Sequence, residues 1–175
     1  MKNDGGISIL GTSGIVEPMS KKADVLIGGK RALEIYNDID CKKIIITADL
    51  DSVRKYIKEH YIEKKIAVLV SGDPGLYSFL KYLKKYFSDD ELEVIPGISA
   101  IQLAFARSKM IWQDAKIISL QGKDNKDRLL EAVQSNNKVA VFTDSHFIPQ
   151  LKGKKVAVIS SGDPGVYGMA GLVLK

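Results

Sequence analysis

Apolar residues gather along the chain in six short runs, most of which are rich in valine and isoleucine. The runs are nearly continuous in apolar character, as strands are when both faces of a parallel sheet are covered. The pattern therefore predicts six buried strands, at residues 44–47, 66–70, 92–95, 116–120, 139–142 and 156–159.

Between several of these runs, apolar residues recur three or four positions apart, which is the spacing of a helix with one buried face. Three segments show this spacing, at residues 53–61, 76–87 and 129–133. Strands that alternate with helices predict an α/β protein. Because the pattern is interrupted at residues 108–114, we expect two α/β lobes, an N-terminal lobe over 1–110 and a C-terminal lobe over 115–175.

A glycine-rich turn follows the predicted strand at residues 66–70, with the sequence Ser-Gly-Asp-Pro-Gly from Ser71 to Gly75. This turn should lie at the carboxyl edge of the sheet, where open α/β sheets bind ligands and where glycine lets the backbone approach a ligand closely. Pro74 is suited to the first turn of the helix predicted after it. By composition alone, the segment fits an ordinary connection between a strand and a helix equally well.

A second turn, with the sequence Pro-Gly-Ile-Ser-Ala from Pro96 to Ala100, follows the next predicted strand. Ser99 is a suitable N-cap for a helix that carries Ile101 and Phe105. Two such turns on neighbouring strands could hold one ligand between them, and a capped turn without a ligand is an equal alternative.

The segment around the first turn occurs twice in the chain. Residues 65–77 return with small changes at residues 155–167. The offset is far longer than the unit of a solenoid protein, so it indicates a duplicated or grafted element.

Other residue combinations predict no further kind of site. The segment from Gly11 to Gly14 lacks the ending of a phosphate-binding P-loop, and the dinucleotide pattern of nicotinamide-binding proteins is absent. Asp144, Ser145 and His146 are consecutive, so they cannot meet as a hydrolase triad. Two histidines and one cysteine, without partners at ligand spacing, predict no metal site and no disulfide within the chain.

A length of 175 residues, with 45% hydrophobic and 27% charged residues, is typical of a globular protein with a real core. The net charge of +5 is spread over scattered lysines, which suits an acidic small molecule. No nucleic-acid module is recognisable, and no apolar run reaches the length of a membrane span or a secretory signal. We therefore expect a cytoplasmic protein that binds neither nucleic acid nor a membrane.

Three motifs, in matching order and spacing, resemble the cobalt-precorrin-7 C(5)-methyltransferase branch of the tetrapyrrole (precorrin) methylases. They lie at residues 23–31, 70–77 and 94–107, within a similarity that covers about residues 21–145. The Gly-Gly-Lys-Arg sequence at residues 28–31 and the Gln-Leu-Ala-Phe-Ala-Arg sequence that begins at Gln102 help to distinguish this branch from its relatives.

This resemblance implies two α/β lobes with a cleft between them, in a homodimer. It also implies a methyltransferase that uses S-adenosylmethionine to methylate a ring carbon of a precorrin or cobalt-precorrin in cobalamin biosynthesis, by analogy carbon 5. No catalytic residue is assigned. The residues expected to bind the cofactor are Gly72, Asp73, Pro74, Gly75, Tyr77, Pro96, Gly97, Ile98, Ser99 and Ala100. The residues expected on the substrate side, where cations could meet the acidic side arms of the macrocycle, are Gly28, Gly29, Lys30 and Arg31.

Both ends of the chain depart from that branch. Residues 5–20 resemble a segment of cobalt-precorrin-5B C(1)-methyltransferase, where the branch normally has a strand and a Gly-x-Gly-Pro-Gly loop. Residues 153–175, which include the second Ser-Gly-Asp-Pro-Gly sequence, are similar to a cofactor loop of precorrin-3B C(17)-methyltransferases. We therefore interpret the chain as a mosaic and expect a shortened second lobe. The alternative to an active enzyme is a non-catalytic module that keeps the fold and weak cofactor binding.

Overall fold

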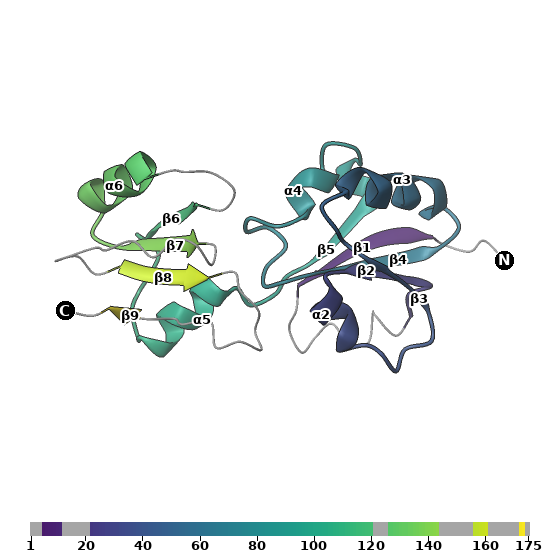
Figure 1. The fold of residues 1–175 in the computed structure, drawn as a ribbon, viewed down its shortest axis with the longest axis horizontal. Helices are drawn as coiled ribbons and strands as arrows, with labels where there is room; N and C mark the ends of the chain where they lie inside the picture. The colour runs from purple at the N-terminus through teal and green to yellow at the C-terminus, as the bar shows by residue number, and fades with distance from the viewer. Residues whose placement is uncertain (1–4, 12–21, 121–125, 144–155, 161–171, 174–175) are drawn as a thin grey trace. The chain divides into compact units, whose positions relative to one another are not determined.

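Figure 1 shows the fold in the computed structural model, which describes residues 5–11, 22–120, 126–143, 156–160 and 172–173. The chain divides into two compact units, residues 1–99 and residues 100–175. The sequence interpretation placed this boundary later, at residues 108–114. The difference arises because helix α5 (Ala100–Arg107) packs within the second unit, where it contacts strand β8 (Val156–Ser160).

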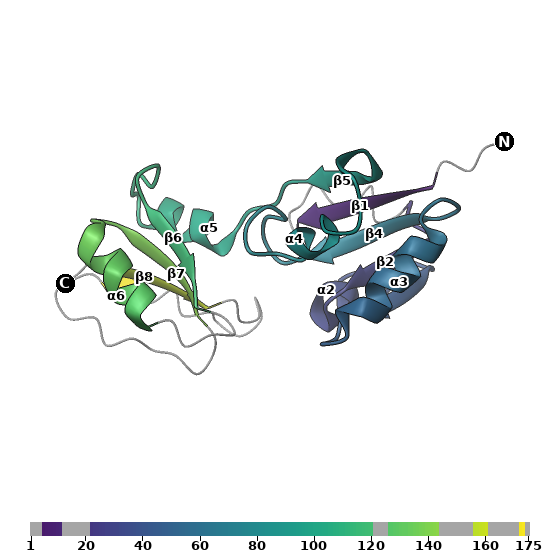
Figure 2. The same cartoon turned by 90° about the horizontal axis from the view of Figure 1, so that it is seen from above.

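A five-stranded sheet forms the first unit, and all its neighbouring strands pair in parallel. The strands are β1 (Gly6–Gly11), β2 (Val25–Gly28), β3 (Lys42–Ile45), β4 (Lys65–Val70) and β5 (Leu92–Ile95), in the spatial order β3-β2-β4-β1-β5. Figure 2 shows the sheet from above, with the arrowheads of β1, β4 and β5 at the same edge. Strands are present near the predicted residues 44–47, 66–70 and 92–95, although the first of them runs from Lys42 to Ile45. The prediction of burial is confirmed for β4 but is wrong for β3 and β5, which are the outer strands of the sheet and have no buried residue.

The strand pattern missed β1 and β2. β1 carries Ser8 between two isoleucines and a glycine at each end, and β2 is only four residues long, so neither forms a long apolar run. Even so, β1 lies between β4 and β5, and its side chains Ile7, Ile9 and Leu10 are at most 2% exposed. The segment that departs from the family resemblance therefore contributes a central strand of the sheet.

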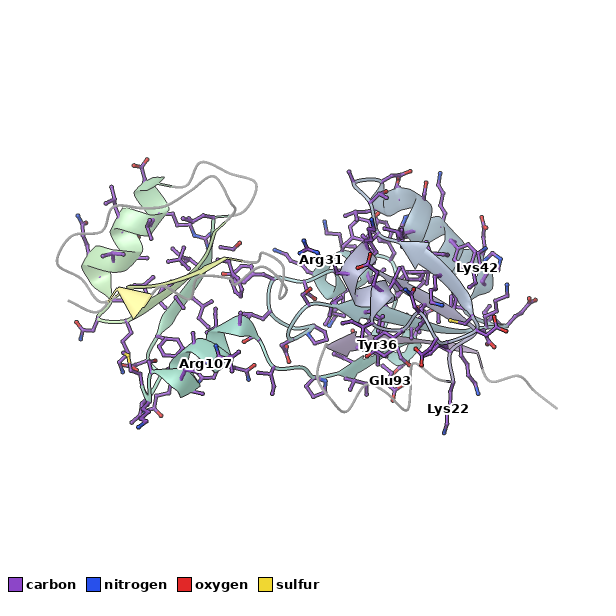
Figure 3. All side chains as sticks on the ribbon, turned by 60° about the horizontal axis from the view of Figure 1, so that its bottom comes forward. Lys22, Arg31, Tyr36, Lys42, Glu93 and Arg107 are labelled. Carbon is purple, nitrogen blue, oxygen red and sulfur yellow. The ribbon has the colours of Figure 1, made fainter. Side chains whose placement is uncertain are left out.

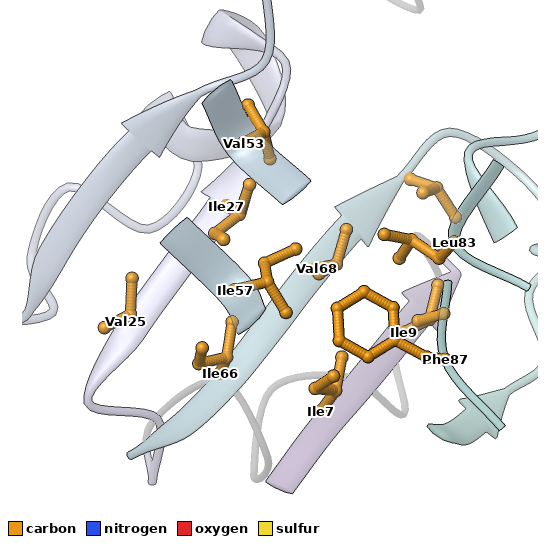
Figure 4. Close-up of a cluster of buried hydrophobic side chains, with 11 residues drawn as sticks. Ile7, Ile9, Val25, Ile27, Val53, Ile57, Ile66, Val68, Leu83 and Phe87 are labelled. Carbon is orange, nitrogen blue, oxygen red and sulfur yellow. The ribbon is translucent and has the colours of Figure 1, made fainter. Parts of the chain in front are cut away.

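Helices cover both faces of this sheet, with α3 (Leu50–His60) and α4 (Leu80–Leu83) on one face and α2 (Lys30–Glu34) on the other (Figure 1). The side chains between the sheet and the first pair of helices form a buried cluster (Figure 4) of Ile7, Ile9, Val25, Ile27, Val53, Ile57, Ile66, Val68, Val70, Leu83 and Phe87. A smaller cluster on the α2 side consists of Leu10, Leu26, Leu33, Ala67 and Leu69. The inner strands β2, β4 and β1 are thus buried on both faces, although the apolar runs predicted only β4 among them.

The second unit has a four-stranded sheet in the order β6-β7-β8-β9. β6 (Lys116–Ser119), β7 (Val139–Thr143) and β8 are parallel, and β9 (Leu172–Val173) runs antiparallel to β8. Helix α6 (Lys126–Ser135) buries Leu129 and Val133 as predicted, but Leu130 is 52% exposed and Ala132 is buried in its place. The α/β prediction is confirmed for both units. None of the helices in the described part of the chain has the length and apolar character that a membrane span requires.

Helix α5 ends at a residue with a left-handed backbone. Lys109 has a φ of 54°, its N–H donates to the carbonyl of Ala106 at 3.1 Å, and the N–H of Met110 donates to the carbonyl of Phe105 at 3.0 Å. These two bonds form a Schellman cap, in which glycine is the usual residue because it has no Cβ. A lysine at this position therefore leaves backbone strain in the helix end.

We expect Lys109→Gly to raise the free energy of unfolding by about 0.5 kcal/mol, because the relief of strain exceeds the added entropy of the unfolded chain. The control is Ala106→Gly in the last turn of the same helix, where the backbone is helical, and this substitution should lower the free energy of unfolding by about 0.5 kcal/mol. Urea denaturation followed by the fluorescence of Trp112, whose ring stacks on Phe105 with centroids 5.9 Å apart, measures both changes. A loss of stability in both variants would show that the backbone at Lys109 is not strained.

Glu91 connects the end of α3 to the segment before β5. The hydroxyl of Tyr61 donates to Glu91 Oε1 at 2.5 Å, and the N–H of Ser88 donates to Glu91 Oε2 at 2.7 Å. These hydrogen bonds, with that of Tyr61 the strongest cause, lower the pKa of the Glu91 carboxyl from 4.5 to about 2. Because the folded-state pKa is depressed, the stabilisation is complete above pH 4.5 and is lost as the pH falls towards 2.

Glu91→Gln should therefore flatten the fall of the free energy of unfolding with acidification below pH 4.5. Tyr61→Phe should raise the pKa of Glu91 towards its ordinary value, because it removes the strongest hydrogen bond to the carboxylate. Denaturation at a series of pH values measures the first effect, and carboxyl NMR titration measures the second. If Glu91→Gln lost stability below pH 4.5 as steeply as the unsubstituted protein does, the Glu91 carboxylate would not contribute to the free energy of unfolding in this pH range.

Candidate functional site

Two loops and the end of β1 meet at one edge of the first sheet. β4, β1 and β5 are adjacent and parallel, so their carboxyl ends lie side by side. Gly11 ends β1, residues 71–75 follow β4, and residues 96–99 follow β5. The strand order reverses between β4 and β1. The next strand after β1 is β2, which lies beyond β4, whereas the next strand after β4 is β5, which lies beyond β1. Ligands of open α/β sheets bind at such a reversal of strand order.

Gly11, Gly72 and Gly97 pack backbone against backbone at this edge, and we call these three residues the glycine junction. A Cβ on Gly11 would lie 2.5 Å from the carbonyl oxygen of Gly72 and 2.6 Å from Cα of Gly97. A Cβ on Gly97 would lie 2.7 Å from Cα of Gly11. Gly72 has a φ of 73°, a conformation that side chains disfavour. Glycine is therefore required at all three positions for the loops to approach this closely.

The carboxylate of Asp73 connects the loop after β4 to the loop after β5. Its Oδ1 accepts a hydrogen bond from the N–H of Gly75 at 2.8 Å, and its Oδ2 accepts one from the N–H of Gly97 at 3.3 Å. The two Gly-containing loops therefore converge, although the strands before them are not neighbours as predicted, since β1 lies between β4 and β5. Their role in cofactor binding stays a prediction.

The backbone after this loop differs from the predicted helix over residues 76–87. Pro74 lies in a turn, and the helix α4 begins only at Leu80. Tyr77 has a φ of 50°, and the hydroxyl of Ser78 donates to the carbonyl of Pro74. Because a left-handed residue interrupts the helical path, Pro74 does not occupy a first helical turn, and the ring of Tyr77 is left 48% exposed.

The groups exposed around the glycine junction include peptide groups, the polar residue Ser71 and apolar side chains. Gly75 and Pro96 are exposed, and the side chain of Ile98 is 62% exposed although it is apolar. Ser99 has the one buried polar side chain among the residues whose burial is described, and α5 begins directly after it at Ala100, as the capping prediction requires. Such an edge can bind a ligand that has both hydrogen-bonding and flat apolar parts.

The predicted substrate residues lie at the same edge of the sheet, at the end of β2. Gly28 ends β2, Gly29 is extended, and Lys30 begins α2. Lys30 and Arg31 are both exposed, and Figure 3 shows Arg31 at the surface. Lys30 and Arg31 follow β2, and residues 71–75 follow β4, which is the neighbour of β2 in the sheet. Their contact with a substrate stays a prediction.

Sequence analysis missed the contribution of Gly11 to this site. It rejected the segment from Gly11 to Gly14 as a phosphate loop and noted that related proteins have a strand and a glycine loop at this place, but it assigned neither to this chain. The feature that could have identified Gly11 is its place directly after Ile9 and Leu10, where an apolar segment ends in glycine.

Several predicted features lie outside the described residues. They are residues 12–14, the Asp-Ser-His sequence at residues 144–146 and the second Ser-Gly-Asp-Pro-Gly sequence at residues 161–165. The strand before that second sequence is present as β8. Within the described ranges, no group of three His, Cys, Asp or Glu side chains could hold a metal ion.

A family model for tetrapyrrole (corrin/porphyrin) methylases matches residues 19–152 of this chain. Among known proteins, the chain is 42% identical over 123 residues to a probable cobalt-precorrin-7 C(5)-methyltransferase of Methanocaldococcus jannaschii. That match covers 68% of this chain and 58% of the relative, so the chain spans little more than half of the relative's length.

Two further similarities extend the comparison. The chain is 33% identical over 106 residues to a probable cobalt-factor III C(17)-methyltransferase of Methanothermobacter thermautotrophicus, which covers 56% of this chain and 30% of that protein. The crystal structure of a cobalamin biosynthesis precorrin-6Y methylase from Archaeoglobus fulgidus superimposes with a TM-score of 0.65 at 25% identity, over 81% of this chain and 75% of that one. The C(5) and C(17) relatives agree with the interpretation of the chain as a mosaic.

Proposed function

Because this chain belongs to the tetrapyrrole (corrin/porphyrin) methylase family, we propose that it transfers the methyl group of S-adenosylmethionine to a ring carbon of a cobalt-precorrin in cobalamin biosynthesis. The observation that carries this proposal is the convergence of two loops and the end of β1 at the glycine junction. The similarity to a C(5)-methyltransferase supports carbon 5 as the position methylated. The family resemblance further supports a cytoplasmic homodimer.

The groups around the glycine junction fit S-adenosylmethionine. The peptide C=O of Gly75 and the peptide groups of Ile98 would hydrogen-bond the ribose and the methionine part, and the exposed side chains of Tyr77 and Ile98 would pack against the adenine. Gly75 is exposed without a side chain, so a ligand could approach the backbone closely there.

S-Adenosylmethionine, when bound, supplies a methyl group that its sulfonium makes electrophilic. This chain therefore needs no nucleophile of its own. Its residues need only hold the methyl donor and the acceptor carbon in line and keep water out. The packing of Gly11 against Gly72 and Gly97 would hold the loops in place before the cofactor binds, so little ordering entropy would be lost on binding.

Lys30 and Arg31 would face the carboxylates on the side arms of the macrocycle. Both are exposed at the carboxyl edge, and an arginine can hold a carboxylate with two parallel hydrogen bonds. The net charge of +5 would favour the approach of such an anion.

A second candidate is a non-catalytic module that binds the cofactor weakly. The observation that favours it is that residues 5–20 and 153–175 resemble other methylases than the rest of the chain does. A pocket with altered walls would bind the methyl donor without completing the reaction.

The test is to incubate the purified chain with S-adenosylmethionine and a pool of cobalt-precorrins, and to analyse the products by mass spectrometry. The enzyme should yield a product that is one methyl group heavier, and the same mixture without S-adenosylmethionine should not. Cofactor binding without a mass change would favour the non-catalytic module. Calorimetry that shows no cofactor binding would contradict both candidates.

A further inference from the structure

Asp73 has both of its carboxylate oxygens engaged by backbone groups of two different loops. Oδ1 accepts from Gly75 in its own loop, and Oδ2 accepts from Gly97 in the loop after β5. Asp73 and Gly97 lie 24 positions apart in sequence, and they belong to different strand connections. A carboxylate is suited to this role because it accepts hydrogen bonds at both oxygens and donates none.

We propose that Asp73 is a positioning residue, which holds the loops after β4 and β5 together so that the cofactor finds its site already formed. In this role its carboxylate is neither the base that takes a proton from the substrate nor a ligand of the transferred group. The cofactor part of this inference rests on the proposed function, whereas the connection between the loops does not.

The glycine junction explains why one carboxylate can have this effect. Gly97 packs so closely on Gly11 that a Cβ at either residue would lie within 2.7 Å of backbone atoms of the other. A displacement of the Gly97 N–H is therefore passed directly to the end of β1. Loss of the Asp73 bond would therefore loosen both loops and the end of β1 together.

The variants Asp73→Asn and Asp73→Ala separate the possible roles. Asparagine keeps one acceptor oxygen and places an NH₂ donor at the other position, so it can satisfy only one of the two N–H groups. Alanine satisfies neither. The matched control is Glu93→Gln, which removes a carboxylate from β5 that accepts only the hydroxyl of Ser8, at 2.8 Å, in the same sheet.

The first readout is amide hydrogen exchange of the free protein, measured by NMR. We expect faster exchange at the Gly97 and Gly75 N–H groups in Asp73→Ala, faster exchange at one of them in Asp73→Asn, and no change at either in Glu93→Gln. Unchanged exchange in both Asp73 variants would overturn the positioning role. This readout needs no cofactor, so it stands even if the proposed function fails.

The second readout is calorimetric titration with S-adenosylmethionine, combined with turnover at saturating cofactor. A positioning residue predicts affinity weaker by about tenfold in Asp73→Asn and by about a hundredfold in Asp73→Ala, with turnover changed by less than about fivefold. A general base predicts the opposite division, with affinity retained and turnover lower by a factor of about 10² to 10⁴. That second pattern would overturn the proposal, whereas absence of binding in the unsubstituted protein would contradict the proposed function instead.

Discussion

Gly11→Ala is expected to lower the free energy of unfolding of the first unit by about 3 kcal/mol and to weaken S-adenosylmethionine binding by at least about tenfold. The added Cβ would lie 2.5 Å from the carbonyl oxygen of Gly72 and 2.6 Å from Cα of Gly97. Both neighbours are backbone, so neither can rotate away as a flexible side chain could. The loops must separate, and the proposed cofactor site changes shape with them.

Gly6→Ala, in the same strand, is the matched control. A Cβ on Gly6 would meet no atom within 4 Å, so this substitution should change the free energy of unfolding by less than about 0.5 kcal/mol and leave cofactor affinity unchanged. Chemical denaturation and calorimetric titration measure the two quantities for each variant. Equal effects of the two substitutions would show that the junction is not as tightly packed as the structure indicates.

Ile57→Ala is expected to destabilise the first unit by about 4 kcal/mol. The side chain of Ile57 is 0% exposed within the cluster between α3 and the sheet, where Val68 and Phe87 also lie (Figure 4). Truncation removes buried methyl and methylene groups and leaves a cavity, and both effects cost stability. The same truncation at Ile62, which is 71% exposed, should cost less than about 0.5 kcal/mol.

The two units can be followed separately during such unfolding. The single tryptophan, Trp112, lies in the second unit, and every tyrosine except Tyr167 lies in the first. The loss of tyrosine signal should therefore shift to lower urea in Ile57→Ala, while Ile62→Ala follows the unsubstituted protein. A shift of equal size in both variants would contradict the assignment of Ile57 to the core.

The strands that sequence analysis identified correctly are those with long apolar runs. β4 is buried along almost its whole length, and its five buried residues made it readily recognisable. β1 has comparable burial from Ile7, Ile9 and Leu10, but Ser8 and terminal glycines interrupt its apolar pattern. The burial of β1 results from its position between β4 and β5, which is a property of the tertiary structure that no local pattern encodes.

The helix predicted over residues 76–87 also shows that a local pattern does not determine the backbone near the site. Its apolar spacing is genuine, since Leu83 and Phe87 are buried. However, periodicity does not report a left-handed residue such as Tyr77, and the hydrogen bonds of Asp73 and Ser78 stabilise a turn where the pattern extended the helix. The convergence of the two loops was expected from the assumption that β4 and β5 are neighbours, whereas β1 lies between them and the packing of Gly11 against both loops required coordinates.

The central claim is that the glycine junction forms the binding site for S-adenosylmethionine. Its most direct test is to record amide NMR spectra of the full chain while S-adenosylmethionine is added. If S-adenosylmethionine binds there, the largest changes in amide chemical shift should occur at Gly11, Gly72, Gly75, Gly97 and Ile98. Saturating cofactor that leaves these amides unchanged, or shifts only residues elsewhere in the chain, would contradict it.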